Sequence, residues 1–207
     1  VLGLALAALL LAGPAAATTF TVNGYELGEY IQLTDGRFGY TAMFDVELDG
    51  VPGYSFCVDL DTYIWADSYP VRALLDPYAG GSPAGEAPRN FAWAGLVVEN
   101  FGFDVDALVS ATVTRAQAIT GIQAAIWEGI YGGGLVVSSS LSDGARTVFE
   151  TVMGAQMVAN GSSVIVEMEG VQDQITSAPI PEPTAALVFG LGMVIIGASR
   201  RNRVTGR

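Results

Sequence analysis

One thiol and one amide stand out because each side chain needs a chemical explanation. Cys57 is the single cysteine among 207 residues, so it has no partner for an internal disulfide. Gln123 falls within the apolar stripe of a predicted helix, formed by Ile119, Ile122, Ile126, Trp127 and Ile130. A buried amide without a hydrogen-bond partner costs about 1–3 kcal/mol. We therefore expect the thiol to be buried, joined to another molecule or chemically used, and Gln123 to have a partner, which a neighbouring backbone group could also supply.

Both residues lie in short motifs that resemble those of bacterial surface thioester domains. Cys57 lies between the aromatic Phe56 and the apolar Val58 in a predicted strand over 54–60. Gln123 follows the apolar Ile122 in a predicted helix, and the pair Ile126-Trp127 comes one turn later. Ile122 stands where many members of that family have Thr. The resemblance covers residues 54–131. It implies an internal thioester between Cys57 and Gln123, supported by the motif residues Phe56, Val58, Ile122, Ile126 and Trp127.

The resemblance implies a covalent adhesin and not an enzyme. The Cys57 sulfur would attack the Gln123 side-chain carbonyl and release ammonia, and an amine on a partner would later displace the sulfur in a single turnover. Holding the two groups together can supply about 7–11 kcal/mol of the barrier. No cofactor is implied. The sequence contains no Lys, so the protein has no ε-amine that could consume its own thioester, although codon usage or adaptation to an acidic proteome would also explain this composition.

Other polar residues near these motifs have simpler explanations. Gln117 is the expected capping partner of Thr114 at the start of the helix. Asp59 and Asp61 alternate after Cys57, which would place them on one strand face, where they could tune the thiol or bind Ca²⁺. A solvated carboxylate pair explains the same spacing, so no metal site is predicted. We expect the three tryptophans to lie in the core, namely Trp65, Trp93 and Trp127.

The sequence pattern of the elements that must position these residues predicts an α+β fold. Apolar and polar residues alternate from 20 to 59, with turns at Asp35-Gly36 and Asp49-Gly50, which is typical of antiparallel strands. A Gly- and Pro-rich loop follows over 76–88. Helical spacing then predicts helices over 88–101, 115–131 and 143–158, and a last strand covers 164–168. We predict an antiparallel sheet or sandwich in the N-terminal part with a helical part packed on it.

The N-terminal end has the pattern of an export signal. Residues 1–17 are uncharged and end in three alanines, which is typical of the apolar region and cleavage site of a signal peptide, although a buried helix is the alternative. The extracellular domain is then expected over 18–177. This part is acidic, because four of the nine basic residues of the chain lie in the last eight positions and 21 residues are acidic. Such a surface excludes nucleic acid as a partner.

The C-terminal end, over 178–207, has the pattern of a sorting segment. An apolar run over 184–199 would form a short transmembrane helix with a cytoplasmic C-terminus. The order of elements resembles the PEP-CTERM sorting signal, which implies processing by a membrane-embedded exosortase. A plain single-span anchor predicts the same topology. The motif residues are Pro181, Glu182 and Pro183, followed after the apolar run by Arg200, Arg201 and Arg203.

Two other classes of function remain as alternatives to covalent adhesion. The first is a non-covalent structural or carbohydrate-binding module of the biofilm matrix with a buried free Cys57. The second, a hydrolase, has little support, because the sequence contains no His, and therefore no Ser-His pair, and no recognisable metal-ligand set. The leading hypothesis is a protein of the cell surface or extracellular matrix that captures an amine-bearing protein or polymer.

Overall fold

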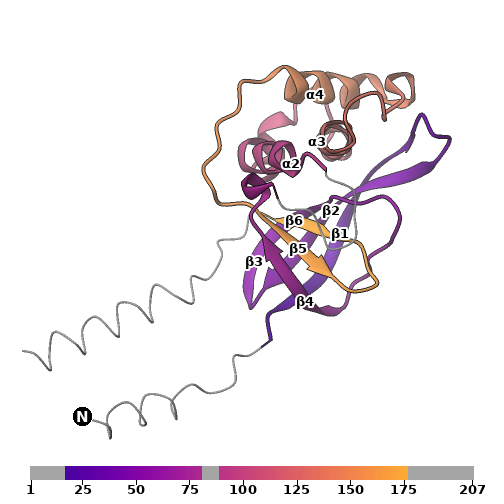
Figure 1. The fold of residues 1–207 in the computed structure, drawn as a ribbon. Coiled ribbons are helices and arrows are strands. Elements are labelled where there is room, and N and C mark those ends of the chain that lie inside the picture. Colours follow the sequence, from indigo (N-terminus) through magenta and orange to yellow (C-terminus); the bar gives the residue numbers. More distant parts are fainter. Residues whose placement is uncertain (1–16, 81–88, 177–207) are drawn as a thin grey trace, which may run out of the picture.

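A barrel of antiparallel strands with helices gathered on one side forms the part of the protein that the structure describes, residues 17–80 and 89–176 of a computed structural model (Figure 1). The strand order around the barrel is β1-β2-β3-β6-β5-β4, and β4 pairs back onto β1. All neighbouring pairs are antiparallel. The strands are β1 Thr19–Gln32, β2 Phe38–Leu48, β3 Val51–Cys57, β4 Ser68–Leu75, β5 Val164–Met168 and β6 Gln174–Thr176.

The predicted turns join the first three strands. Asp49 and Gly50 have φ angles of 51° and 77° between the paired residues Leu48 and Val51, which is the geometry of a two-residue hairpin. Gly36, with a φ of 88°, closes the turn between β1 and β2. Both Asp-Gly predictions are confirmed, and the second turn sets the register that places Cys57 at the end of β3.

Three α-helices follow the first four strands, together with shorter helical turns. Helix α2 (Phe91–Val97) continues into the π-helical turn η2 (Val98–Gly102), and α3 (Arg115–Ile130) and α4 (Asp143–Gly154) come next. The predicted capping box at the start of α3 is present, with Thr114 and Gln117 bonded reciprocally. The short 3₁₀ turns are η1 Pro77–Ala79, η3 Val105–Leu108 and η4 Ser138–Ser140.

Helix α3 is the centre of the molecule and presents Gln123 to the barrel. It packs against β1 and β2 of the barrel and against α2 and α4, as Figure 1 shows. Its burial therefore extends beyond the predicted apolar stripe to small residues that allow close approach. Thr120, Gly121, Ala124 and Ala125 are all buried along with the isoleucines. A helix covered on several sides holds its side chains in fixed positions, which a reactive site requires.

The predicted antiparallel sheet or sandwich is a closed barrel. Strands β5 and β6 come from the C-terminal part of the described chain and insert between β3 and β4. The sequence did not predict β4, which has no buried residue and contains Pro70, nor β6, which has only three residues. The predicted strand over 164–168 is confirmed, whereas the outer helices are shorter than expected.

The two predicted targeting segments fall on residues that the structure does not describe. The signal peptide over 1–17 is described only at Ala17, and the sorting segment over 178–207, including its Pro-Glu-Pro motif and arginines, lies wholly outside the described residues. Among the described residues, no helix has the length and apolar character needed to span a membrane.

Candidate functional site

Cys57 lies at the last position of β3, inside the protein. Its side chain is buried, and the flanking residues Phe56 and Val58 are both fully buried. Cys57 pairs with Gln174 of the neighbouring strand β6, and the Val58 N–H donates to the Asp173 carbonyl at 3.1 Å. The end of β3 is thus held against the segment that links β5 and β6.

Gln123 reaches Cys57 from α3, but it contacts the Cys57 backbone. The Cys57 N–H donates to Gln123 Oε1 at 3.0 Å, and Gln123 Nε2 donates to the Cys57 carbonyl at 2.8 Å. The prediction that Gln123 is buried and has a partner is confirmed, since its side chain is 0% exposed. Its amide joins α3 to the end of β3. This is the simpler of the expected explanations, a hydrogen bond to a neighbouring backbone group.

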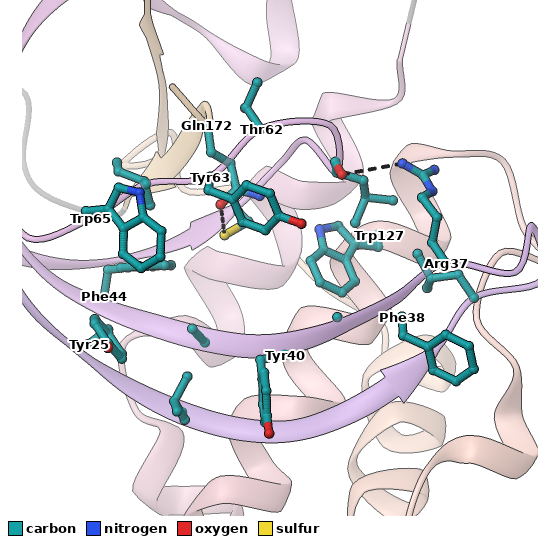
Figure 2. Close-up of a pocket in the computed structure, with 17 residues that line it drawn as sticks. Tyr25, Arg37, Phe38, Tyr40, Phe44, Thr62, Tyr63, Trp65, Trp127 and Gln172 are labelled. Atoms are coloured by element: carbon teal, nitrogen blue, oxygen red, sulfur yellow. Dashed lines mark hydrogen bonds between the residues drawn. The ribbon is translucent and has the colours of Figure 1, made fainter. Parts of the chain in front are cut away.

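The sulfur of Cys57 has different partners, both from the β5–β6 segment. Cys57 Sγ donates to Gln172 Oε1 at 2.8 Å (Figure 2). Gln174 Nε2 donates to Sγ at 3.5 Å. Both glutamines are buried. Sequence analysis missed them because the last predicted strand ended at residue 168. Two glutamines separated by one residue after the Gly170 turn, in a segment bordered by Val171 and Ile175, were the available signal.

The Gln172 side chain is held at both ends of its amide. Its Nε2 donates to the Asp59 carbonyl at 2.7 Å while its Oε1 accepts from the Cys57 thiol. Gln174 is held by Ser55, whose hydroxyl donates to Gln174 Oε1 at 3.0 Å. A thiol and an amide carbonyl in contact are the two reactants of an internal thioester, and fixed orientation is what such a weak electrophile requires.

Burial controls the ionisation of the thiol. Burial raises the pKa of Cys57 to about 12; the hydrogen bond from Gln174 acts in the opposite direction, and the negative charge of Asp59 raises the pKa further. Because the thiolate is the reactive form of cysteine, the free thiol of the folded protein is nearly inert toward external reagents near neutral pH.

Asp59 and Asp61 do not lie on one strand face, which corrects the sequence prediction. The strand ends at Cys57, so both residues belong to the following turn. Asp59 is buried and accepts backbone and hydroxyl donors, whereas Asp61 is exposed and pairs with Arg37 at 2.7 Å. The described residues contain no group of three or more His, Cys, Asp or Glu side chains that could hold a metal ion.

A pocket of about 460 Å³ opens beside the sulfur, and seven of the 17 residues that line it are aromatic (Figure 2). Cys57, Gln172 and Trp127 line it, and Trp127 Nε1 is buried without a hydrogen-bond partner among the described residues. Trp65 lies at the pocket and is 67% exposed, so the prediction that it belongs to the core is wrong. The other aromatic lining residues are Tyr25, Phe38, Tyr40, Phe44 and Tyr63.

The remaining motif residues form the walls behind the site. Ile122 and Ile126 are fully buried in α3, and Trp127 is 4% exposed. Trp93 packs against the core, and its indole N–H donates to the Ala125 carbonyl at 2.8 Å, so α2 is fixed to α3 near Gln123. The sequence motifs therefore mark the rigid surroundings of Cys57, whereas the amide that contacts its sulfur comes from another segment.

Comparison with known proteins gives structural similarity only. No protein-family model and no curated protein matches the chain. The N-terminal thioester domain of fibronectin-binding protein SfbI from Streptococcus pyogenes aligns with a TM-score of 0.48 and 12% identity, over 82% of this chain and 97% of that chain. The N-terminal domain of the Streptococcus pyogenes pilus tip adhesin Cpa aligns with a TM-score of 0.46 and 15% identity, over 73% and 93% of the two chains. Because both superpositions are loose, function is inferred here from the contacts around Cys57.

Proposed function

We propose that this protein forms an internal thioester between Cys57 and Gln172 and uses it once to acylate an amine on a partner molecule. The observation that carries the proposal is the 2.8 Å contact between Cys57 Sγ and Gln172 Oε1. Gln123, which the helix motif suggested as the acyl group, has both ends of its amide engaged with the Cys57 backbone. We therefore assign the acyl group to Gln172 and a supporting part to Gln123.

Formation of the thioester needs no reagent beyond the two side chains. The Cys57 sulfur attacks Cδ of Gln172, the bond between Cδ and Nε2 breaks, and the thiol proton leaves with the nitrogen as ammonia. The thiol donates to Oε1 of Gln172, so its proton must pass from the oxygen side of the amide to Nε2 as the bond between Cδ and Nε2 breaks. Fixed geometry supplies on the order of 7–11 kcal/mol toward such a reaction, which compensates for a thiol that ionises only at high pH.

Capture of a partner is the second half of the reaction. The nitrogen of an incoming amine attacks the same carbon, the bond to sulfur breaks, and the proton of the amine passes to the sulfur. Cys57 becomes a free thiol and Gln172 is joined to the partner through an amide. The acyl group is consumed once, so the protein is an acyl donor and not an enzyme, and no cofactor takes part. This chemistry fits an adhesin for amine-bearing proteins or polymers.

We further propose that the protein acts outside the cell. The support is the signal pattern over 1–17 and the order of the Pro-Glu-Pro motif, apolar run and arginines over 178–207, which indicate export, a membrane anchor and processing by an exosortase. A tag inserted after Thr19 should be removed by protease added to intact cells. A tag protected on intact cells and cleaved only after lysis would show that the domain stays inside.

The second candidate function is a non-covalent module of the extracellular matrix. The aromatic pocket favours it, because exposed aromatic faces bind apolar and ring-shaped ligands without any covalent step. Cys57 would then remain a buried free thiol. The two candidate functions predict different masses for the protein, because only thioester formation releases ammonia.

The intact mass of the purified full chain tests the proposal. The wild type should weigh one ammonia less than its sequence, and Cys57→Ala and Gln172→Ala should each restore the mass expected from their own sequences. Gln117→Ala, which removes the cap of α3 and a hydrogen bond to Ser142 but no contact with Cys57, should keep the deficit. A wild-type mass equal to the full sequence in freshly made protein would reject the thioester and leave the non-covalent module.

A further inference from the structure

Asp59 is a buried carboxylate whose contacts join two distant segments. Its residue is 5% exposed, and a carboxylate at that depth needs several donors to be tolerated. Oδ1 accepts from the N–H groups of Asp61 and Thr62 at 3.1 and 3.2 Å, and from the Thr62 hydroxyl at 3.0 Å. These bonds close the turn that follows Cys57.

The second oxygen of the carboxylate reaches the β5–β6 segment. Oδ2 accepts from the Asp173 N–H at 2.7 Å, and it shares the Thr62 hydroxyl at 3.0 Å. Asp173 directly follows Gln172, so this bond holds the backbone next to the amide that contacts the sulfur. The Asp59 side chain thus connects the turn after β3 with the segment that contributes Gln172.

The main chain of Asp59 holds the other end of Gln172. Its carbonyl accepts from Gln172 Nε2 at 2.7 Å. An amide is planar, so a fixed Nε2 together with a fixed backbone leaves Oε1 directed at the Cys57 sulfur, at 2.8 Å. The nitrogen held by Asp59 is also the atom that departs as ammonia.

We infer that Asp59 is a positioning residue for thioester formation, because it holds the Gln172 amide against Cys57 Sγ through its carboxylate and its carbonyl. The inference rests on the proposed thioester. In that reaction the bond between Sγ and Cδ forms, the bond between Cδ and Nε2 breaks, and the thiol proton leaves in ammonia. Asp59 forms no bond in the reaction. It sets the starting geometry, where a displacement of about 1 Å can slow a reaction on the order of 100-fold.

The test follows re-formation of the thioester in the full chain. Opening the thioester with ammonium regenerates the Gln172 amide and the Cys57 thiol, and removal of ammonium then starts a new round of formation, measured as loss of one ammonia by mass spectrometry. Asp59→Asn is isosteric, but an amide NH2 group replaces one of the two carboxylate oxygens, so the side chain cannot accept from both Thr62 and Asp173. Asp59→Glu keeps the acceptor oxygens and moves them by one methylene.

Thr62→Val is the matched control. It removes the hydroxyl that donates to both Asp59 oxygens but leaves the bonds to Asp173 and Gln172 in place. At a temperature where circular dichroism shows every variant folded, both Asp59 variants should re-form the thioester roughly 10- to 100-fold more slowly than the wild type. Thr62→Val should re-form it at close to the wild-type rate even if its melting temperature falls.

A second readout separates positioning from general stability. After reaction with methylamine, peptide mapping should find the label on Gln172 in the wild type, and partly on Gln174 in the Asp59 variants, because Gln174 Nε2 lies 3.5 Å from the same sulfur. Rates that simply follow melting temperature, or wild-type rates in both Asp59 variants, would overturn the positioning role while the thioester stands. A wild type without any mass deficit would remove the proposed function and this inference with it.

Discussion

Three glutamines surround Cys57, one in contact with its backbone and two in contact with its sulfur. Gln123 binds the backbone N–H and carbonyl, Gln172 accepts from the thiol, and Gln174 donates to the sulfur. A carboxamide can donate and accept, so three of them satisfy the buried polar groups of one residue without a charge. Under the proposed function, Gln172, which accepts from the thiol, is the acyl partner, and Gln123 and Gln174 support it.

The free thiol should make the folded protein less stable at high pH. Gln172→Ala leaves Cys57 unable to form the thioester, and burial raises the pKa of the Cys57 thiol to about 12 from 9.0. The folded state then keeps a proton that the unfolded chain loses near pH 9. The stability contribution is therefore present below about pH 9 and is lost as the pH rises toward 12.

Urea unfolding of Gln172→Ala from about pH 8 to about pH 11 measures this loss. The control is the double variant Cys57→Ala with Gln172→Ala, which shares every other group, including Tyr78, whose pKa burial also raises to about 12. The single variant should lose more stability with rising pH than the double variant. Equal slopes would mean that the Cys57 thiol is not buried in the folded protein.

At the scale of elements, the contact between α2 and α3 depends on a glycine. A Cβ added at Gly129 would lie 1.9 Å from Trp93 Cδ1 and 2.2 Å from its Nε1, which donates to Ala125. Gly129→Ala should therefore lower the free energy of unfolding by about 1–3 kcal/mol through overpacking. Thermal or urea unfolding measures the change.

Gly154 provides the matched control for that substitution. It is the last residue of α4, and a Cβ there would meet nothing within 4 Å. Gly154→Ala should therefore leave stability unchanged within experimental error. If Gly129→Ala unfolded at the same point as Gly154→Ala, Trp93 could not be packed on α3 as described.

Elements that depend on residues close in sequence were predicted well, and elements that depend on long-range strand pairing were predicted poorly. The Asp-Gly turns, the capping box at Thr114 and the strand Val164–Met168 each follow from residues close in sequence, and all were predictable. Closure of the barrel depends on β6, a strand of three residues stabilised mainly by its neighbours β3 and β5. No periodicity can be read from so short a segment, so the prediction was an antiparallel sheet or sandwich and not a closed barrel.

The same limitation explains why the sequence singled out Gln123 and not Gln172. Gln123 could be singled out because a polar residue in an apolar helical stripe is visible from spacing alone. Gln172 lies in a turn region, where a polar residue is unremarkable, and it meets Cys57 only because β6 pairs with β3. The sequence therefore identified the thiol and its supporting helix, while the amide in contact with the sulfur required the three-dimensional arrangement.

At the scale of the whole molecule, the pocket connects the buried sulfur with the surface. Trp65 contributes an exposed wall, so Trp65→Ala should not affect folding or thioester formation. It should slow capture of an amine with a long apolar stem by up to about tenfold, because an aromatic contact contributes about 0.5–1.5 kcal/mol. Capture of methylamine, which is too small to reach Trp65, should not change.

Phe103→Ala is the control for this prediction. Phe103 is also an exposed aromatic residue, at 48% against 67% for Trp65, but it does not line the pocket. Its removal should leave capture of both amines unchanged, as followed by intact mass over time. A Trp65→Ala variant that captured the long amine as fast as Phe103→Ala would show that the partner reaches the thioester by another route.

The position of a methylamine label tests the central claim most directly. Wild-type protein treated with methylamine and then digested should carry the label on Gln172, and Cys57 should become a free thiol that reacts once the chain is unfolded. Gln123→Ala, where it remains folded, should still place the label on Gln172. A label on Gln123, or unlabelled protein with a full-mass Gln172 peptide, would contradict the assignment of the Gln172 amide to the Cys57 sulfur.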